Sequence, residues 1–157
     1  MPDSNGEKLP KRTRYEEIVN MFLLMIQDYN LLEVPQAEAE TNVKMLFEDA
    51  VGDLQDLVLN VSGIDLYDYD DEEEVFNAQL PRPVVKMIVL TMVKNWFSPF
   101  LLNTEHMHNI LNTKDFNQYS PGNFLNRLRE LNEDLEDRIR RERAWYSQRF
   151  GYLRENM

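Results

Sequence analysis

The chain has 157 residues, a formal net charge of −11 and no cysteine. Its length fits one domain, and a hydrophobic content of 43% is enough for a sizeable core. The lack of cysteine excludes a disulfide framework, thiol chemistry and the cysteine-based zinc sites. Residues 1–12 are polar and predict a flexible arm. They contain no apolar segment of the kind found in a secretory signal.

Two amphipathic helices are predicted next, over residues 14–30 and 37–61. Thr13 and Glu16 have the spacing of a capping box at the start of the first helix. In both helices apolar side chains recur every three or four residues, so each has one face for a core. Ser62-Gly63 predicts the end of the second helix, since glycine commonly follows a helix.

Negative charge is concentrated in one part of the chain. Between Glu16 and Leu80 there are seventeen acidic residues and a single basic residue, Lys44. This asymmetry indicates a surface of one sign. Charge runs most often form a solvated face without a further role, and this interpretation stays open beside any functional one.

The acidic segment over residues 64–79 has no helical periodicity and predicts a loop, within which residues 75–80 can extend. An EF-hand calcium loop needs glycine at its sixth position and glutamate at its twelfth. Counted from Asp68, these positions hold Glu73 and Gln79. The segment therefore does not fit a calcium loop. A mobile acidic loop and weak, unstructured binding of divalent cations both stay open as interpretations.

The stretch QLPRPVVKMIVLTMVKNWFSPF, residues 79–100, is the most apolar part of the chain. Its prolines suit the first turn of a helix, which is predicted to end near Ser98-Pro99. The apolar run contains Lys86 and Lys94 and is shorter than the roughly 20 residues that a bilayer requires. A helix that is apolar nearly all round is surrounded by others. We expect it in the core of a bundle, or in a core plus a subunit interface.

A short helix over residues 104–111 and a long final helix from Ser120-Pro121 to about Arg149 complete the prediction. Along the final helix a narrow apolar stripe runs close to a coiled-coil seam and turns polar at Glu142. The expected fold is all-α, a small bundle of four to five helices with a long C-terminal helix. The side chains expected at the core or subunit interface are Val85, Ile88, Val89, Met92, Trp96, Phe97, Leu128, Leu131, Leu135 and Ile139.

The sequence carries no motif typical of catalysis or cofactor binding. The chain has no nucleophile motif and no glycine-rich phosphate loop,. His106 and His108 are two residues apart, so on a helix they point to opposite sides and cannot share a metal. We predict no catalytic, cofactor-binding or metal-binding residue, and a protein that is not an enzyme.

The segment RIRRERAWYSQRFGY, residues 138–152, combines arginines with aromatic rings. Such a segment can stack on and neutralise nucleic acid, but these residue types are also typical of protein interface hot spots. The preceding acidic residues, 130–137, would repel a phosphate backbone, which favours a protein partner. The candidate docking residues are Arg138, Arg141, Trp145, Tyr146, Arg149, Phe150 and Tyr152.

The order of an acidic amphipathic helix pair, an acidic linker and LPRPVVKMIVLTMVKNWFSP resembles the head–tail connector (adaptor) proteins of tailed bacteriophages. In that family a Leu-Pro…Val-Lys…Ile…Leu…Val…Trp-(Tyr/Phe) helix follows a variable linker. The matching residues here are Leu80, Pro81, Val85, Lys86, Ile88, Leu90, Val93, Trp96 and Phe97. LFEDAVGDLQDLVLNVSGIDL is similar to the preceding helix, and SPGNFLNRLRELNEDLEDRI to C-terminal helices of virion proteins. This chain continues for about 55 residues past the tryptophan helix.

The resemblance implies a structural virion protein of the phage neck, assembled in the host cytoplasm. It implies a homo-oligomeric ring, usually a dodecamer, that docks on the portal protein and receives the next neck or tail protein. Double-stranded DNA would pass through without specific binding, and no membrane is involved. In that arrangement residues 1–12 are an arm, 13–119 the connector-like domain and 120–157 the C-terminal helix and tail. The acidic residues expected to face the channel are Asp49, Asp53, Asp56, Asp68, Asp70 and Asp71.

Two other functions remain compatible with the sequence. The first is an acidic regulatory protein, such as a DNA mimic, that uses the acidic residues between Glu16 and Glu74 to occupy a DNA-binding protein. The second is a small helical protein that binds nucleic acid through residues 138–149, with the steep salt dependence of phosphate contacts.

Overall fold

The computed structural model describes residues 11–28, 39–110 and 122–155. Most of residues 1–12 and the predicted helix start at Ser120-Pro121 lie outside these ranges. The described chain is an all-α bundle with a small antiparallel hairpin, which confirms the predicted fold class. Its elements are α1 (Tyr15–Asp28), α2 (Ala39–Ser62), β1 (Tyr69–Asp70), β2 (Val75–Phe76), α3 (Arg82–Ile110) and α5 (Gly122–Glu155).

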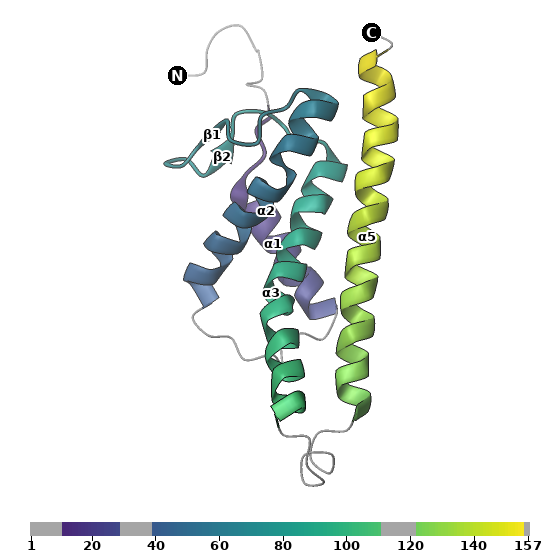
Figure 1. Cartoon of the computed structure of the whole chain (residues 1–157). Helices are drawn as coiled ribbons and strands as arrows, with labels where there is room; N and C mark the ends of the chain where they lie inside the picture. The colour runs from purple at the N-terminus through teal and green to yellow at the C-terminus, as the bar shows by residue number, and fades with distance from the viewer. Residues whose placement is uncertain (1–10, 29–38, 111–121, 156–157) are drawn as a thin grey trace, which may run out of the picture.

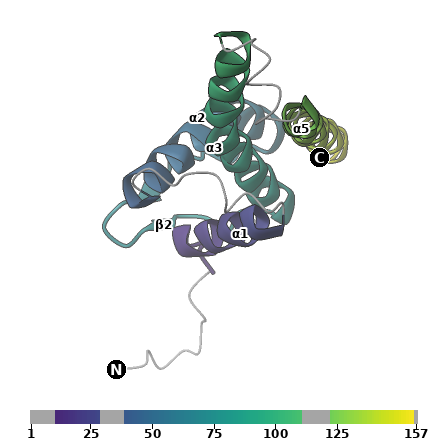
Figure 2. The same cartoon turned by 90° about the horizontal axis from the view of Figure 1, so that it is seen from below.

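Helix α3 lies at the centre of the bundle, and α1, α2 and α5 contact it from different sides (Figures 1 and 2). The long α5 runs beside α3 in the opposite direction and also contacts α2. The β1–β2 hairpin and α5 lie on opposite sides of the bundle in both views (Figures 1 and 2). The most apolar helix of the sequence is therefore the one that its neighbours surround.

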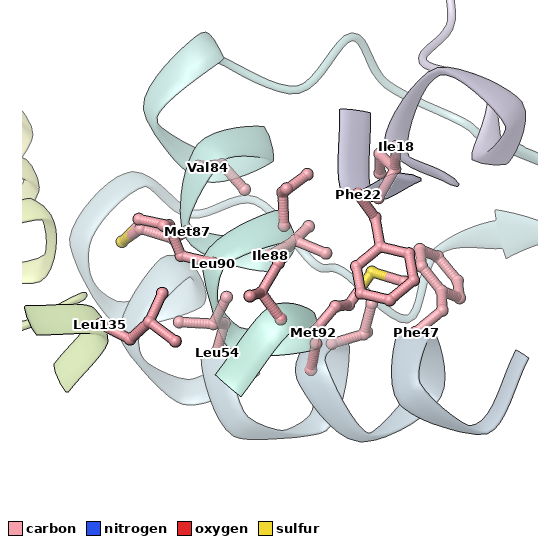
Figure 3. Packing of buried hydrophobic residues seen from close by; sticks show 14 of the residues in the cluster. Ile18, Phe22, Phe47, Leu54, Val84, Met87, Ile88, Leu90, Met92 and Leu135 are labelled. Carbon is pink, nitrogen blue, oxygen red and sulfur yellow. The ribbon is translucent and has the colours of Figure 1, made fainter. Parts of the chain in front are cut away.

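The core forms where side chains of α1, α2 and α5 converge on α3 (Figure 3). Met87, Ile88 and Leu90 of α3 are fully buried, and Leu54 of α2 and Leu135 of α5 are also fully buried. Complete burial of one such side chain stabilises a fold by about 1.5–3 kcal/mol. The burial of α3 explains why its apolar residues show no single face.

Helix α3 passes through Pro99 without ending, so the predicted helix end at Ser98-Pro99 and the separate helix over 104–111 are wrong. Proline has no N–H and loses one bond of the helix ladder. Leu101, beyond the proline, is 7% exposed and belongs to the core. Packing of the helix on both sides of Pro99 offsets the lost bond, an effect that local sequence rules do not include.

Thr13 does not cap α1, contrary to the predicted capping box. Its hydroxyl oxygen accepts a hydrogen bond from the Leu80 N–H at 2.8 Å, and its carbonyl accepts one from the Phe76 N–H at 2.8 Å. The chain before α1 is thereby joined to the segment between the hairpin and α3. Arg12, which was predicted to belong to the flexible arm, is joined to the hairpin, because its guanidinium forms an ion pair with Glu73 at 3.1 Å.

The predicted acidic loop contains a short hairpin, in which Tyr69 pairs with Phe76 and Asp70 with Val75. The possible extension over residues 75–80 is limited to Val75–Phe76. The Asp70 carboxylate accepts hydrogen bonds from the N–H groups of Glu72 and Glu73, at 2.9 and 3.1 Å. An acidic side chain thus shapes the turn that joins the two strands.

The end of α2 agrees with the prediction. Gly63 has a φ of 75°, which favours glycine, and its N–H donates to the Leu59 carbonyl at 2.9 Å,. The following loop is held by Gln55, whose amide donates to Asp65 and accepts from the Leu66 N–H, both at 2.7 Å. These bonds direct the chain from α2 into the hairpin.

Candidate docking surfaces

The residues predicted for a core or subunit interface lie in the interior of the single chain. Six of the ten are at most 7% exposed: Ile88, Val89, Met92, Phe97, Leu128 and Leu135. The other four are partly buried and pack against the same core: Val85, Trp96, Leu131 and Ile139. Among the described side chains of α3, the chain therefore covers most of the apolar surface by itself, Leu102 at 63% exposure being an exception, and these ten residues act first as a core.

The predicted docking residues of α5 divide into two groups. Tyr146 is fully buried, and its hydroxyl donates to the Ser62 hydroxyl at 2.6 Å. Phe150 is half-buried with its ring centroid 4.8 Å from that of Tyr146. The expectation that Tyr146 meets a partner is wrong, because every fourth or third residue of a packed helix returns to the core face. Burial also raises the pKa of the Tyr146 phenol.

Trp145 and Arg149 form the exposed group. Trp145 is 44% exposed, and the guanidinium carbon of Arg149 lies 5.1 Å from the centroid of its ring. This cation–π contact holds both side chains together at the surface. Arg141 is exposed and Arg138 is partly buried, whereas the side chain of Tyr152 lies outside the described residues.

Trp145 lies at a groove between α1, the start of α3 and α5. The groove has a volume of about 880 Å³, and its apolar lining includes Met21 and Met25 of α1 and Val85 of α3. Met21 is 41% exposed. The two methionines are not among the residues predicted for a docking site, because they lie beside the predicted apolar face of α1. Methionine is common at adaptable binding surfaces. Two methionines beside the apolar face of a predicted helix are therefore the sequence signal that could have indicated this groove.

The residues of α2 that were predicted to face a channel lie on its solvent side. Asp49, Asp53 and Asp56 are all exposed. Their spacing of four and three residues places them on one helical face. They match the predicted one-sign surface.

The acidic residues of the hairpin have more varied surroundings. Asp68 accepts a hydrogen bond from the Asn77 amide at 2.7 Å, and Asp70 caps the turn as described above. Asp71 is exposed. Two of the three predicted hairpin residues therefore have a local structural role in addition to their charge.

Within the described ranges no group of three or more His, Asp or Glu side chains is arranged to hold a metal ion. The side chains of His106 and His108 lie outside the described residues. No helix in the described part of the chain is long and apolar enough to cross a bilayer. Comparisons of this chain with models of protein families, with curated proteins and with solved structures found no match.

Proposed function

We propose that this chain is a structural virion protein that forms the head–tail connector ring of a tailed bacteriophage neck. In this role it docks on the portal protein, extends the DNA channel and receives the next neck or tail protein. The resemblance of residues 80–97 to the connector helix supports the proposal. The observation that carries it is a helical bundle with two surfaces of different chemistry, an acidic face on α2 and the groove at Trp145, whose ring is covered by the Arg149 guanidinium.

The acidic face suits a channel wall. Asp49, Asp53 and Asp56 repel the phosphates of double-stranded DNA, so a ring that turns them inward lets DNA pass without binding it. In this role their number and sign matter more than their individual positions.

The groove beside α5 suits a docking site for the portal or the next neck protein. Tryptophan and arginine are among the residue types most enriched in interface hot spots, and the Arg149 guanidinium lies over the Trp145 ring. In the ring, neighbouring subunits would contact one another through partly buried residues at the edge of the bundle, such as Val85 and Trp96.

The direct test is a cryo-EM reconstruction of particles whose protein content includes this chain. We expect a ring between portal and tail, with the twelve subunits that are usual in the connector family. The paired variant Trp145→Ala/Arg149→Ala should reduce its incorporation, while Arg140→Ala/Arg143→Ala, at exposed positions of the same helix, should not. Particles without the chain, and a soluble monomer or dimer in its place, would overturn the proposal.

An acidic regulatory protein is the second candidate. The observation that favours it is the complete burial of Ile88, Val89 and Met92 within one chain, since the bundle then needs no neighbouring subunit for its core. This candidate predicts a monomer or dimer that competes with DNA for a DNA-binding protein. Such competition, lost when Asp49, Asp53 and Asp56 are replaced by asparagine, would distinguish it from the connector.

A further inference from the structure

A second cavity lies on the other side of the bundle from α5, between α1, α2 and the hairpin. Its volume is about 340 Å³. The connector proposal gives this cavity no role. Its aromatic lining comes from all three elements, with Tyr15 of α1, Phe47 of α2 and Tyr69 of β1.

The aromatic wall of this cavity is held in place by packing. The Tyr15 ring centroid lies 4.6 Å from that of Phe47 and 5.8 Å from that of Tyr69. Phe76, 1% exposed, supports Tyr15 and Phe47 with centroid distances of 5.3 and 5.9 Å. The faces of aromatic rings attract cations, most strongly where water is partly excluded.

The rim of the cavity is acidic. Glu16, Glu48, Asp71 and Glu74 line it, against one basic residue, Lys44. None of these four carboxylates forms an ion pair within the described part of the chain. They come from α1, α2 and the turn of the hairpin, so a cation in the cavity is attracted from three sides.

The Tyr15 hydroxyl is an unused hydrogen-bonding group at this site. It is buried and has no hydrogen-bond partner among the described residues. Burial and the nearby Asp71 carboxylate raise the pKa of Tyr15, so the phenol stays protonated and neutral. A buried hydroxyl without a partner is unfavourable. A ligand that enters the cavity deeply enough for one of its N–H groups to reach the Tyr15 oxygen would remove that cost.

We propose that this cavity binds the side chain of an arginine presented by a basic partner polypeptide. A guanidinium is planar, stacks on aromatic rings and donates several hydrogen bonds to carboxylates, which suits these walls better than the compact ammonium of lysine. The four rim carboxylates are joined by Glu72, an exposed neighbour of Asp71 in the same turn of the hairpin. This local concentration of negative charge favours a polypeptide with several positive charges over a small cation. The inference does not depend on the connector proposal.

The test uses the full-length protein and a short arginine–glycine peptide as the probe. Titration calorimetry measures its affinity, and NMR follows the ring signals of Tyr15 and Tyr69. The same peptide with neutral citrulline in place of arginine, its lysine counterpart and free arginine amide are the comparison ligands. We expect the arginine peptide to bind most tightly and to shift both tyrosine signals.

The variant Glu16→Gln/Glu48→Gln should weaken binding about tenfold. The matched control Glu130→Gln/Glu133→Gln removes two exposed charges from α5. It should change the affinity for the arginine peptide less than about twofold. Tyr15→Phe keeps the ring and should weaken binding about threefold through the lost hydroxyl. Equal losses in both double variants, equal binding of the citrulline or lysine peptide, or equal binding of free arginine amide would each overturn the proposal. Absence of any binding would overturn it as well.

These outcomes are independent of whether the chain is found in a virion. A failed peptide titration with a ring present in particles would refute only the arginine site. A confirmed site without a ring would refute only the connector proposal.

Discussion

The ammonium group of Lys86 on α3 lies 2.5 Å from a carboxylate oxygen of Glu142 on α5, and the two residues are 56 positions apart. This contact accounts for two irregularities of the sequence, a lysine inside the most apolar helix and a glutamate in the apolar seam of the last one. Lys94 and Glu136 repeat the arrangement at 3.6 Å further along the same pair of helices. Two spaced ion pairs favour one register of α5 on α3, a role for which buried or half-buried polar pairs are best known.

The Lys86–Glu142 pair should contribute a measurable coupling energy. Because both side chains are partly exposed, at 44% and 23%, we expect about 1 kcal/mol from a double-mutant cycle with alanine at each position. Urea unfolding of the four proteins measures it. The coupling should fall in about 1 M salt, which screens partly exposed charges.

The matched control is Asp137 with Arg140, an exposed pair on α5 at 2.8 Å. Its coupling should be about 0.3–0.5 kcal/mol. A larger coupling for the control than for Lys86–Glu142 would contradict the register role of the latter.

The Tyr146–Ser62 hydrogen bond joins α5 to the end of α2. Tyr146→Phe should lower the free energy of unfolding by about 1 kcal/mol, because it removes the bond and leaves the ring packed. Ser62→Ala should cost about 1–3 kcal/mol, since it leaves the buried Tyr146 hydroxyl without its partner. Chemical denaturation measures the free energy of unfolding of both variants. A larger decrease in Tyr146→Phe than in Ser62→Ala would contradict this expectation.

Stability should decrease in alkaline solution. Burial raises the pKa of Tyr146 and of Tyr15 above the ordinary value of 10.0. Below pH 10 the folded and unfolded chains hold the same phenol protons, so the tyrosines add no pH dependence. Above it, the unfolded chain loses those protons first, and the free energy of unfolding falls as pH rises toward the folded pKa values. Unfolding curves from pH 9 to 11 should show a shallower fall for Tyr15→Phe/Tyr146→Phe.

Docking of α5 should depend on Leu135, which is fully buried and belongs to the same core cluster as residues of α2 and α3. Leu135→Ala should lower the free energy of unfolding by about 2–5 kcal/mol, from lost burial and the cavity that remains. Leu102→Ala removes the same atoms from a side chain that is 63% exposed, and should change stability by less than about 0.5 kcal/mol. Similar values for the two variants would show that α5 is not fixed on the bundle in solution.

Pro99 should limit the stability of α3. It lies inside the helix with its side chain exposed, so Pro99→Ala restores one backbone hydrogen bond without disturbing the core. Proline costs up to about 3 kcal/mol relative to alanine in a helix interior, and we expect a higher melting temperature and slightly greater helicity by circular dichroism. An unchanged or lower melting temperature would indicate that the proline shape itself is required there.

The sequence by itself determined the features that depend on short-range order and composition. The three-to-four-residue period of apolar side chains predicted α1, α2 and α5, and Gly63 predicted the end of α2, because a helix repeats every 3.6 residues and glycine accepts its terminal conformation. The absence of a single apolar face predicted a central place for α3. The concentration of acidic residues predicted an exposed negative surface, since unpaired carboxylates are costly to bury.

Only the tertiary structure decided which distant residues meet. The Thr13 hydroxyl bonds Leu80 across 67 positions instead of capping its own helix, and Tyr146 reaches Ser62 across 84 positions instead of a partner. The aromatic cavity likewise needs Tyr15, Phe47 and Tyr69 from three separate elements. Periodicity assigns a side chain to a face, but the partner on that face depends on the packing of whole helices, which is a property of the complete chain.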